Sequence, residues 1–215
     1  DQFTLEPSID DYLATSYTVS DDQRTLTFTI PSGLRWSDGN DLTAKDFVFT
    51  ANHIILREEV LGNYRSGMLM VPEGESVALP FDVQYINDTT RSVTLPDVSA
   101  NLLLEASLFP LPMHVFAPLI GWNEAEHGLD YDWEIGQDEE GNDTLVEFKP
   151  EGVDYSVINS FWGVDTDVSQ VVGNGPWVIG EYIPDQRVIM VPNEHYWKQD
   201  KWGQQNHHPL EWLAI

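Results

Sequence analysis

Cysteine is absent from the 215-residue chain, which excludes disulfide bonds, thiolate catalysis and cysteine-based zinc sites. Basic residues are scarce, since 10 lysines and arginines stand against 36 aspartates and glutamates and the formal net charge is −26. Such a charge repels nucleic-acid phosphates and anionic membrane surfaces. No apolar run approaches the ~18 residues of a membrane span, and no basic-then-apolar signal segment opens the chain. We therefore expect neither a nucleic-acid partner nor a membrane span.

The composition is otherwise that of a folded protein. Hydrophobic residues make up 41% of the chain, enough for the core of one large or two small domains. The acidity suits a secreted or salt-exposed protein with a solvated surface, and it identifies no ligand by itself. Because the chain begins at Asp1 rather than at methionine, we interpret it as a processed protein or an excised piece of a longer one.

Strand patterns recur along the chain. Threonines at 25, 27 and 29 alternate with apolar residues at 26, 28 and 30, a period of two that turns one apolar face inward. Together with the polar residues just before them they predict a hairpin over 17–30. Polar clusters between β-rich runs predict two more hairpins, over 83–95 and 177–191. The last residues, 210–215, read as a further strand.

A tight turn and a capped helix follow the first hairpin. Thr43 and Asp46 have the spacing of a capping box, and apolar residues at 44, 47, 48, 51 and 55 fall on one helical face. These features predict a helix over 43–56. In this interpretation Trp36 packs in the core, Asp38 closes a turn and Gly39 supplies a permissive backbone, so none of the three contacts a ligand.

Three blocks carry a family resemblance. Residues 33–47, GLRWSDGNDLTAKDF, resemble the signature of the family 5 extracellular solute-binding proteins, although Ser32 stands where a basic residue is usual and Asp41 where proline is usual. Residues 173–179 are similar to a second family block, with Asn174 in place of threonine. Residues 187–197 are similar to a third. The blocks keep the order and approximate spacing of the family.

The resemblance implies a mixed α/β fold, namely a partial lobe of a type II periplasmic-binding-protein-like fold with antiparallel hairpins and packed helices. Residues 1–215 would form part of the N-terminal lobe, and the second lobe would be absent. The least family-like stretch, residues 121–160, is interpreted as a variable acidic insertion without helical period, in which 133–135 and 145–148 pair as strands. Upstream, Ser99 is a candidate cap for a helix carrying leucines at 102 and 103.

Family members are receptors of ATP-driven importers for peptides, nickel chelates or sugars. The resemblance thus implies a monomeric, cofactor-free binding protein, periplasmic or extracellular, with a lipid anchor as an option. It would capture a small-molecule or oligopeptide ligand in a cleft between lobes and deliver it to the permease of an ABC transporter. The residues that correspond to cleft walls are Tyr64, Met68, Phe109, Leu111 and Trp162, and core packing is the alternative for each.

Metal sites find weak support in the sequence. Asp138, Glu139, Glu140 and Asp143 supply carboxylates of the kind that calcium prefers, but their spacing fails the EF-hand template and favours a solvated loop. The adjacent His207 and His208 would point to opposite faces of a strand. We expect no metal or cofactor.

Two other functions stay open. The chain has no histidine pair of the zinc-protease type, no G-x-S-x-G elbow and no phosphate loop. Accidental pairs among its 36 acidic residues keep a secreted carbohydrate-active enzyme as an alternative. The eight tryptophans keep a carbohydrate-binding or adhesion module as another, although tryptophan at hairpins is more often core.

Overall fold

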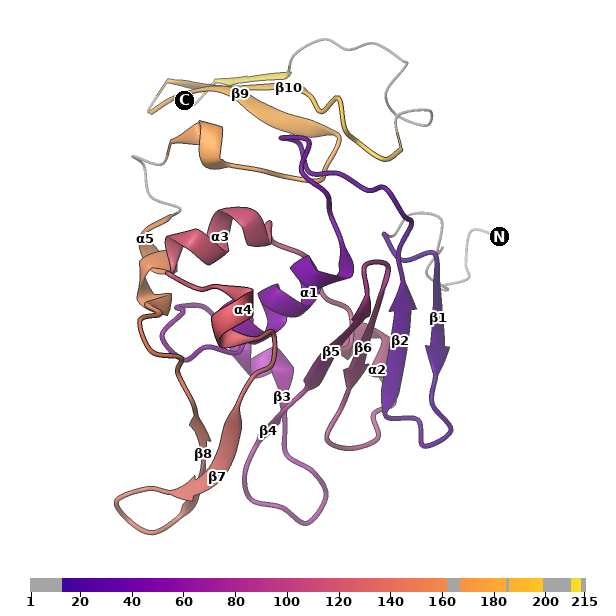
Figure 1. Cartoon of the computed structure of the whole chain (residues 1–215), viewed down its shortest axis with the longest axis vertical. Helices are drawn as coiled ribbons and strands as arrows, with labels where there is room; N and C mark the ends of the chain where they lie inside the picture. The colour runs from indigo at the N-terminus through magenta and orange to yellow at the C-terminus, as the bar shows by residue number, and fades with distance from the viewer. Residues whose placement is uncertain (1–12, 162–166, 185, 199–209, 214–215) are drawn as a thin grey trace.

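The computed structural model of the chain describes residues 13–161, 167–184, 186–198 and 210–213 (Figure 1). Its elements are β-strands, α-helices and short π- or 3-10-helical turns labelled η. In chain order they are β1 (Ser16–Val19), β2 (Thr25–Thr29), α1 (Ala44–Thr50), η2 (Ala51–Ile55), η3 (Arg65–Met68), β3 (Leu69–Met70), β4 (Leu79–Pro80), β5 (Asp82–Asn87), β6 (Thr90–Thr94), α2 (Leu102–Glu105), α3 (Met113–Leu119), α4 (Glu124–His127), β7 (Trp133–Gln137), β8 (Asp143–Glu147), η4 (Tyr155–Val157), α5 (Ile158–Phe161), η5 (Val168–Gln170), β9 (Trp177–Ile183), β10 (Arg187–Pro192) and β11 (Leu210–Leu213).

A four-stranded antiparallel sheet with the order β1-β2-β6-β5 forms one layer. The hairpin predicted over 17–30 is confirmed as β1 and β2, and the one predicted over 83–95 is confirmed as β5 and β6. In β2 and β6 every second residue is buried, because only one face of the sheet meets a core. That face packs on α1, whose residues share a core cluster with Leu26, Val83 and Val93.

The helix predicted over 43–56 is confirmed as α1 continued by η2. The capping box forms as predicted, since Thr43 Oγ1 accepts a hydrogen bond from Lys45 N (3.2 Å) and Asp46 Oδ2 accepts one from Thr43 N (2.8 Å). These bonds satisfy backbone donors that the first helical turn leaves without partners.

This helix differs from the prediction in two respects. Its last turn is a π turn, in which Leu56 N donates to Ala51 O (3.0 Å). A single apolar stripe was expected, yet almost every residue from 44 to 56 is buried. The reason is that a second layer covers the other side of the helix (Figure 1), where Phe49 and Ile54 share a core cluster with Phe116 of α3.

The signature turn has the structural roles that the sequence predicts. Trp36 is 1% exposed and belongs to a core cluster with Leu34 and Phe47. Asp38 Oδ1 accepts a hydrogen bond from Asn40 N (3.1 Å) and closes the turn. Gly39 has a φ of 85°, a left-handed backbone conformation that residues with a Cβ atom rarely adopt.

The three family-like blocks meet in space. Ser37 N donates to Gly173 O (2.9 Å), and Gly173 N donates to Ser37 Oγ (3.1 Å). A Cβ atom at Gly39 would lie 3.2 Å from Nε2 of His195. Trp197 packs against the core cluster that contains Trp36. The three blocks, although distant in the sequence, therefore contact one another in one region of the fold.

A second sheet has the order β11-β10-β9 and lies beyond the signature turn (Figure 1). The hairpin predicted over 177–191 is confirmed as β9 and β10, which pair with a register shift between Ile189 and Met190. The strand predicted over 210–215 is confirmed as β11 for the residues that the structure describes.

One local prediction is wrong. Ser99 does not cap α2, because this helix begins after Asn101, and Ser99 Oγ instead accepts from Asn101 N (3.1 Å) in the preceding turn. The stretch 121–160, in which no helical period was found, contains α4, η4 and the first residues of α5. Each is only one turn long, too short to show a helical period. The pairing predicted there is confirmed, since Ile135 of β7 faces Leu145 of β8.

Candidate functional site

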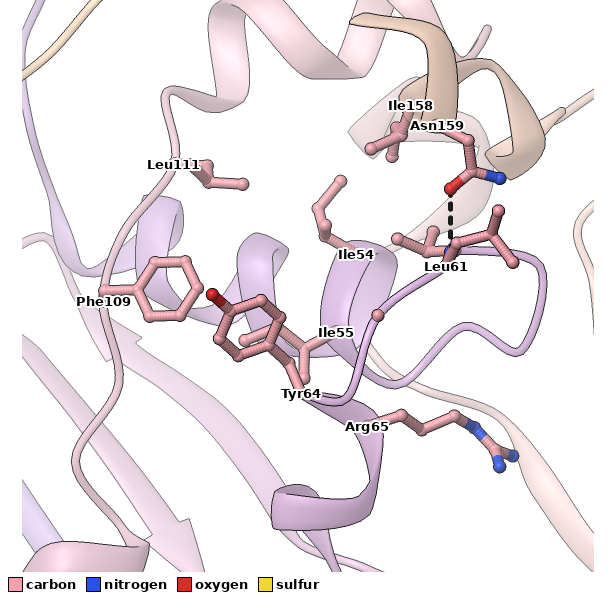
Figure 2. Close-up of a pocket in the computed structure, with 11 residues that line it drawn as sticks. Ile54, Ile55, Leu61, Tyr64, Arg65, Phe109, Leu111, Ile158 and Asn159 are labelled. Carbon is pink, nitrogen blue, oxygen red and sulfur yellow. Dashed lines mark hydrogen bonds between the residues drawn. The ribbon is translucent and has the colours of Figure 1, made fainter. Parts of the chain in front are cut away.

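An apolar pocket of about 350 Å³ opens beside η2, at the end of the helix formed by α1 and η2. Its walls come from four segments that are distant in the sequence: η2, the loop that follows it, the stretch before α3, and α5. Figure 2 shows the side chains around this pocket. Those used below are Ile54, Ile55, Leu61, Tyr64, Phe109, Leu111, Ile158 and Asn159.

The π turn builds the floor of the pocket. Ile54 belongs to the core cluster between the helices, whereas Ile55 belongs to the cluster beneath the sheet. Two neighbouring side chains of a helix point about 100° apart. The pocket lies where the edges of these two core clusters meet, and both isoleucines line it. A π turn inside an α-helix often marks a functional site, because it changes the direction of the side chains that follow.

Two hydrogen bonds fix the stretch before α3 onto α1. Leu111 N donates to Thr50 Oγ1 (2.7 Å), and Met113 N donates to Asp46 Oδ1 (3.0 Å). Burial raises the pKa of Asp46 above its ordinary value, while the hydrogen bonds from the backbone of Thr43 and Met113 oppose the rise. The carboxylate that caps the helix thus also holds Met113, while Thr50 positions Leu111 at the pocket.

Asn159 fixes the loop on the opposite wall. Its Oδ1 accepts a hydrogen bond from Leu61 N (2.7 Å), drawn in Figure 2, and its Nδ2 donates to Glu59 O (2.8 Å). The carboxylate of Glu59 accepts from Lys149 Nζ (2.6 Å). Both ends of the amide are therefore occupied within the chain, and the loop is tied to α5.

An aromatic pair forms the outer wall. The rings of Tyr64 and Phe109 meet edge to face with centroids 5.7 Å apart, a favoured geometry for two aromatic rings. Tyr64 is 68% exposed and Phe109 is 45% exposed. Large exposed aromatic side chains next to a hollow are typical of recognition surfaces rather than of a core.

The five candidate residues from the sequence have different locations. Tyr64, Phe109 and Leu111 line the same pocket. Met68 is only 3% exposed and lies in the core with Phe81. Trp162 falls outside the residues that the structure describes.

Sequence reasoning missed several lining residues. Ile54 and Ile158 were not singled out, and Leu61 and Asn159 carried no recognisable motif. The one available signal is the run Ile54-Ile55-Leu56, which continues past the expected apolar stripe of the helix. The contacts between segments about 100 positions apart have no local signature.

A buried polar cluster supports the pocket from the side. The guanidinium of Arg57 lies 4.7 Å from the ring centroids of both Tyr131 and Tyr155, and its Nη1 donates to Phe148 O (2.9 Å). Burial first, and then the Arg57 cation, lowers the pKa of His53 to about 3. A neutral, fully buried His53 suits a structural role and not proton transfer with a solute.

No group of three or more histidine, aspartate or glutamate side chains arranged to hold a metal ion occurs among the described residues. In the acidic loop, Asp138 Oδ1 accepts from the backbone N–H groups of Glu140 (3.0 Å) and Asn142 (2.7 Å) and thereby closes the turn. His207 and His208 lie outside the described residues. None of the helices within the described ranges is long and apolar enough to cross a membrane.

The fold and the pocket suit a protein that binds a solute, and comparison with known families specifies the class. The family model described as "Bacterial extracellular solute-binding proteins, family 5 Middle" matches residues 9–208. The chain belongs to this family, so the identification from the three sequence blocks is confirmed. The family is one of extracellular binding proteins and not of enzymes.

Curated relatives are longer than this chain. The probable ABC transporter-binding protein of Deinococcus radiodurans is 27% identical over 196 residues, which cover 89% of this chain and 27% of the relative. The periplasmic alpha-galactoside-binding protein of Rhizobium meliloti is 24% identical over 193 residues, which cover 90% of this chain and 23% of the relative. This chain thus spans about a quarter of the length of these relatives.

Solved structures show the same fold. The crystal structure of a putative peptide binding protein AppA from Clostridium difficile has a TM-score of 0.60 at 23% identity, with 95% of this chain and 32% of that chain covered. The oligopeptide-binding protein AppA from Bacillus subtilis, solved in complex with a nonapeptide, has a TM-score of 0.57 at 17% identity, with 95% and 31% covered. The predicted mixed α/β fold of the periplasmic-binding-protein type is confirmed.

Proposed function

We propose that the chain is part of the substrate-binding component of an ABC importer, which captures a peptide-like or other small solute outside the membrane and delivers it to the permease. The observation that carries the proposal is the family match over residues 9–208. The pocket supports it with an exposed aromatic wall and an apolar floor, the usual composition of a small-ligand site.

The proposal places residues 1–215 in the first lobe of a two-lobed receptor, with 121–160 as an insertion and the second lobe elsewhere. The half-exposed strands β9 and β10 fit it, because the remainder of the lobe would cover them. The receptor would act as a monomer on the extracellular or periplasmic side, with or without a lipid anchor.

Within this lobe we propose that Tyr64, Phe109 and Leu111 contact the ligand. Met68 would support them from the core, since it packs in the same cluster as Ile55 of the pocket floor. Trp162 directly follows α5, which contributes Ile158 to the pocket, and it remains a proposed contact.

The natural protein that carries this chain, purified at its full length without denaturation, tests the proposal. Native mass spectrometry should detect a co-purifying solute, and calorimetry should measure rebinding of that solute after its removal. A Tyr64→Ala variant should bind it more weakly, because an exposed aromatic contact is lost without disturbing the core. Failure of the full-length protein to bind any member of peptide, oligosaccharide and nickel-chelate panels would refute the proposed function.

A further inference from the structure

The sequence contains a single Asn-Gly pair, Asn174-Gly175, in the second family-like block, where threonine is usual at position 174. In such a pair the glycine nitrogen can attack the side-chain carboxamide of the asparagine, because glycine has no Cβ atom to hinder the approach. The attack is intramolecular, so the two reacting groups are always close together. Asparagine is among the thermolabile residues of proteins. Whether the pair reacts depends on how firmly the fold holds it.

The structure leaves both reacting groups of this pair free. Neither the side chain of Asn174 nor the backbone nitrogen of Gly175 forms a hydrogen bond with any residue that the structure describes. Both residues are partly exposed and lie outside helices and strands, so water reaches them. The nitrogen is therefore available for the attack, and no hydrogen bond within the described part of the chain has to break first.

The Asp38-Gly39 pair of the signature turn shows the opposite arrangement. Gly39 N donates to Trp36 O (2.9 Å), so the nitrogen that would attack is engaged. The carboxylate of Asp38 accepts hydrogen bonds from Asn40 and pairs with His114. Two pairs that each end in glycine thus lie in contacting blocks, and the fold holds the reacting groups of only one of them.

Hydrogen bonds anchor the chain on both sides of Asn174. Gly173 exchanges two hydrogen bonds with Ser37 of the signature turn, and Gly175 O accepts one from Asn193 Nδ2 (2.8 Å). Asn174 is the single residue between these anchors, just before β9 begins at Trp177. Extra length in the backbone at this position would therefore displace one of the anchors.

From this geometry we propose that Asn174 is a site of spontaneous deamidation and that its isoaspartyl product loosens the contact between the signature turn and the β9–β10 hairpin. Gly175 N forms a bond to Cγ of Asn174, the bond from Cγ to Nδ2 breaks, and the amide proton leaves with this nitrogen as ammonia. Water opens the resulting succinimide ring at either carbonyl, which gives aspartate or isoaspartate. Isoaspartate adds one methylene group to the main chain between the two anchors. Both products add a negative charge to a chain whose formal charge is already −26.

The test uses the full-length natural protein, incubated in mildly alkaline buffer either folded or in guanidinium chloride. Peptide mass spectrometry should show a gain of one mass unit at Asn174 in both samples, at rates within roughly tenfold of each other, because the folded chain leaves the pair free to move. The rate should rise about tenfold per pH unit, since the attacking nitrogen must lose its proton. Conversion in guanidinium chloride alone, or equal conversion of the other asparagines in the folded protein, would overturn the site.

Two variants isolate the chemistry. Gly175→Ala keeps the carboxamide of Asn174 but adds a Cβ atom beside the attacking nitrogen. Beyond its chain neighbours this atom would meet nothing within 4 Å, so the variant should fold normally and deamidate roughly tenfold more slowly. Asn174→Thr restores the residue usual in the family, has no carboxamide and should not react. Conversion of Gly175→Ala at the wild-type rate would overturn the attack by Gly175 N.

Hydrogen exchange tests the structural consequence. After deamidation the amides of Ser37 and Gly173 should exchange roughly tenfold faster than in fresh protein, because the longer backbone separates the two residues. Asn174→Asp adds the charge without the methylene group and should cause a smaller increase. Unchanged exchange after deamidation, or an equal increase in Asn174→Asp, would overturn the loosening by isoaspartate. None of these outcomes depends on which solute the protein binds, so they are independent of the proposed function.

Discussion

The four-stranded sheet and the three-stranded sheet place similar apolar residues in different surroundings. In the first sheet, β2 and β6 alternate buried and partly buried residues, and α1 covers the buried face. In the second sheet, β10 reads Arg-Val-Ile-Met-Val-Pro and all of its residues are of intermediate burial. A near-continuous apolar run is typical of strands that are covered on both faces. Burial therefore requires a facing layer and does not follow from apolar content alone.

Trp36 shares a core cluster with Ile30, which follows β2, and Trp197, which follows β10, packs against that cluster. Truncation of Trp36 should therefore have the largest effect on stability. Trp36→Ala should lower the free energy of unfolding by roughly 3–5 kcal/mol, the usual cost of truncating a buried large aromatic residue. Denaturant titration of both proteins measures this difference. An unchanged midpoint would contradict the core role of Trp36 and reopen a role in recognition.

A matched pair of valines, one in each sheet, tests this difference in burial. Val83→Ala in the first sheet should cost about 2 kcal/mol, because the side chain is 1% exposed and its loss leaves a cavity. Val188→Ala in the second sheet should cost less than about 1 kcal/mol, because the side chain is only partly buried. Equal losses in chemical denaturation would show that both sheets are equally well covered.

A substitution at Asn159 tests whether the loop at the pocket rim opens independently of the helix beneath it. Asn159→Ala removes two hydrogen bonds that hold the loop at Leu61, so the loop should open more often while the unfolding free energy falls by only about 1 kcal/mol. Hydrogen exchange monitors the Leu61 amide, which should exchange faster in the variant. As a control, the amide of Leu56, which donates within the buried helix, should keep its protection. Unaltered exchange at Leu61 would show that the loop is held by other contacts.

The smallest expected effect concerns the signature turn. Burial opposes ionisation of Asp38, but hydrogen bonds from Asn40 and His114 outweigh it and lower the pKa of Asp38 below its ordinary value of 3.8. A lowered folded-state pKa contributes stability that is present above pH 3.8 and is lost as the pH falls through the folded-state pKa. Because the pair with His114 (2.7 Å) is about one-third exposed, the contribution should be below about 1 kcal/mol.

Asp38→Asn tests this contribution by the difference in unfolding free energy from the wild type. The difference should be present near neutral pH and shrink as the pH falls below 3.8. His114→Gln provides a control that removes only the imidazole partner of Asp38, which lies on α3. A difference that stays constant down to pH of about 2 would show that Asp38 acts through its shape rather than its charge.

Local patterns of residues were sufficient to predict the individual elements and the family. Alternating threonines predict β2, the polar residues of the turns locate the hairpins, and Thr43 with Asp46 fixes the beginning of α1. These predictions are confirmed because the signals are hydrogen bonds and side-chain periods within a few residues. The three family-like blocks were recognisable for a related reason, since each has a tight turn or cap that needs particular residue types.

Which of these elements contact one another depends instead on the packing of segments that are distant in the sequence. Layers on both sides bury α1 throughout, although its sequence shows one clear apolar stripe. The pocket unites Ile54 and Tyr64 with Leu111 and Asn159, and Asn159 bonds to a loop about 100 positions away. Met68, a candidate from the same stretch as Tyr64, instead lies in the core. Such contacts depend on how distant segments pack together, a property that no local pattern of residues encodes.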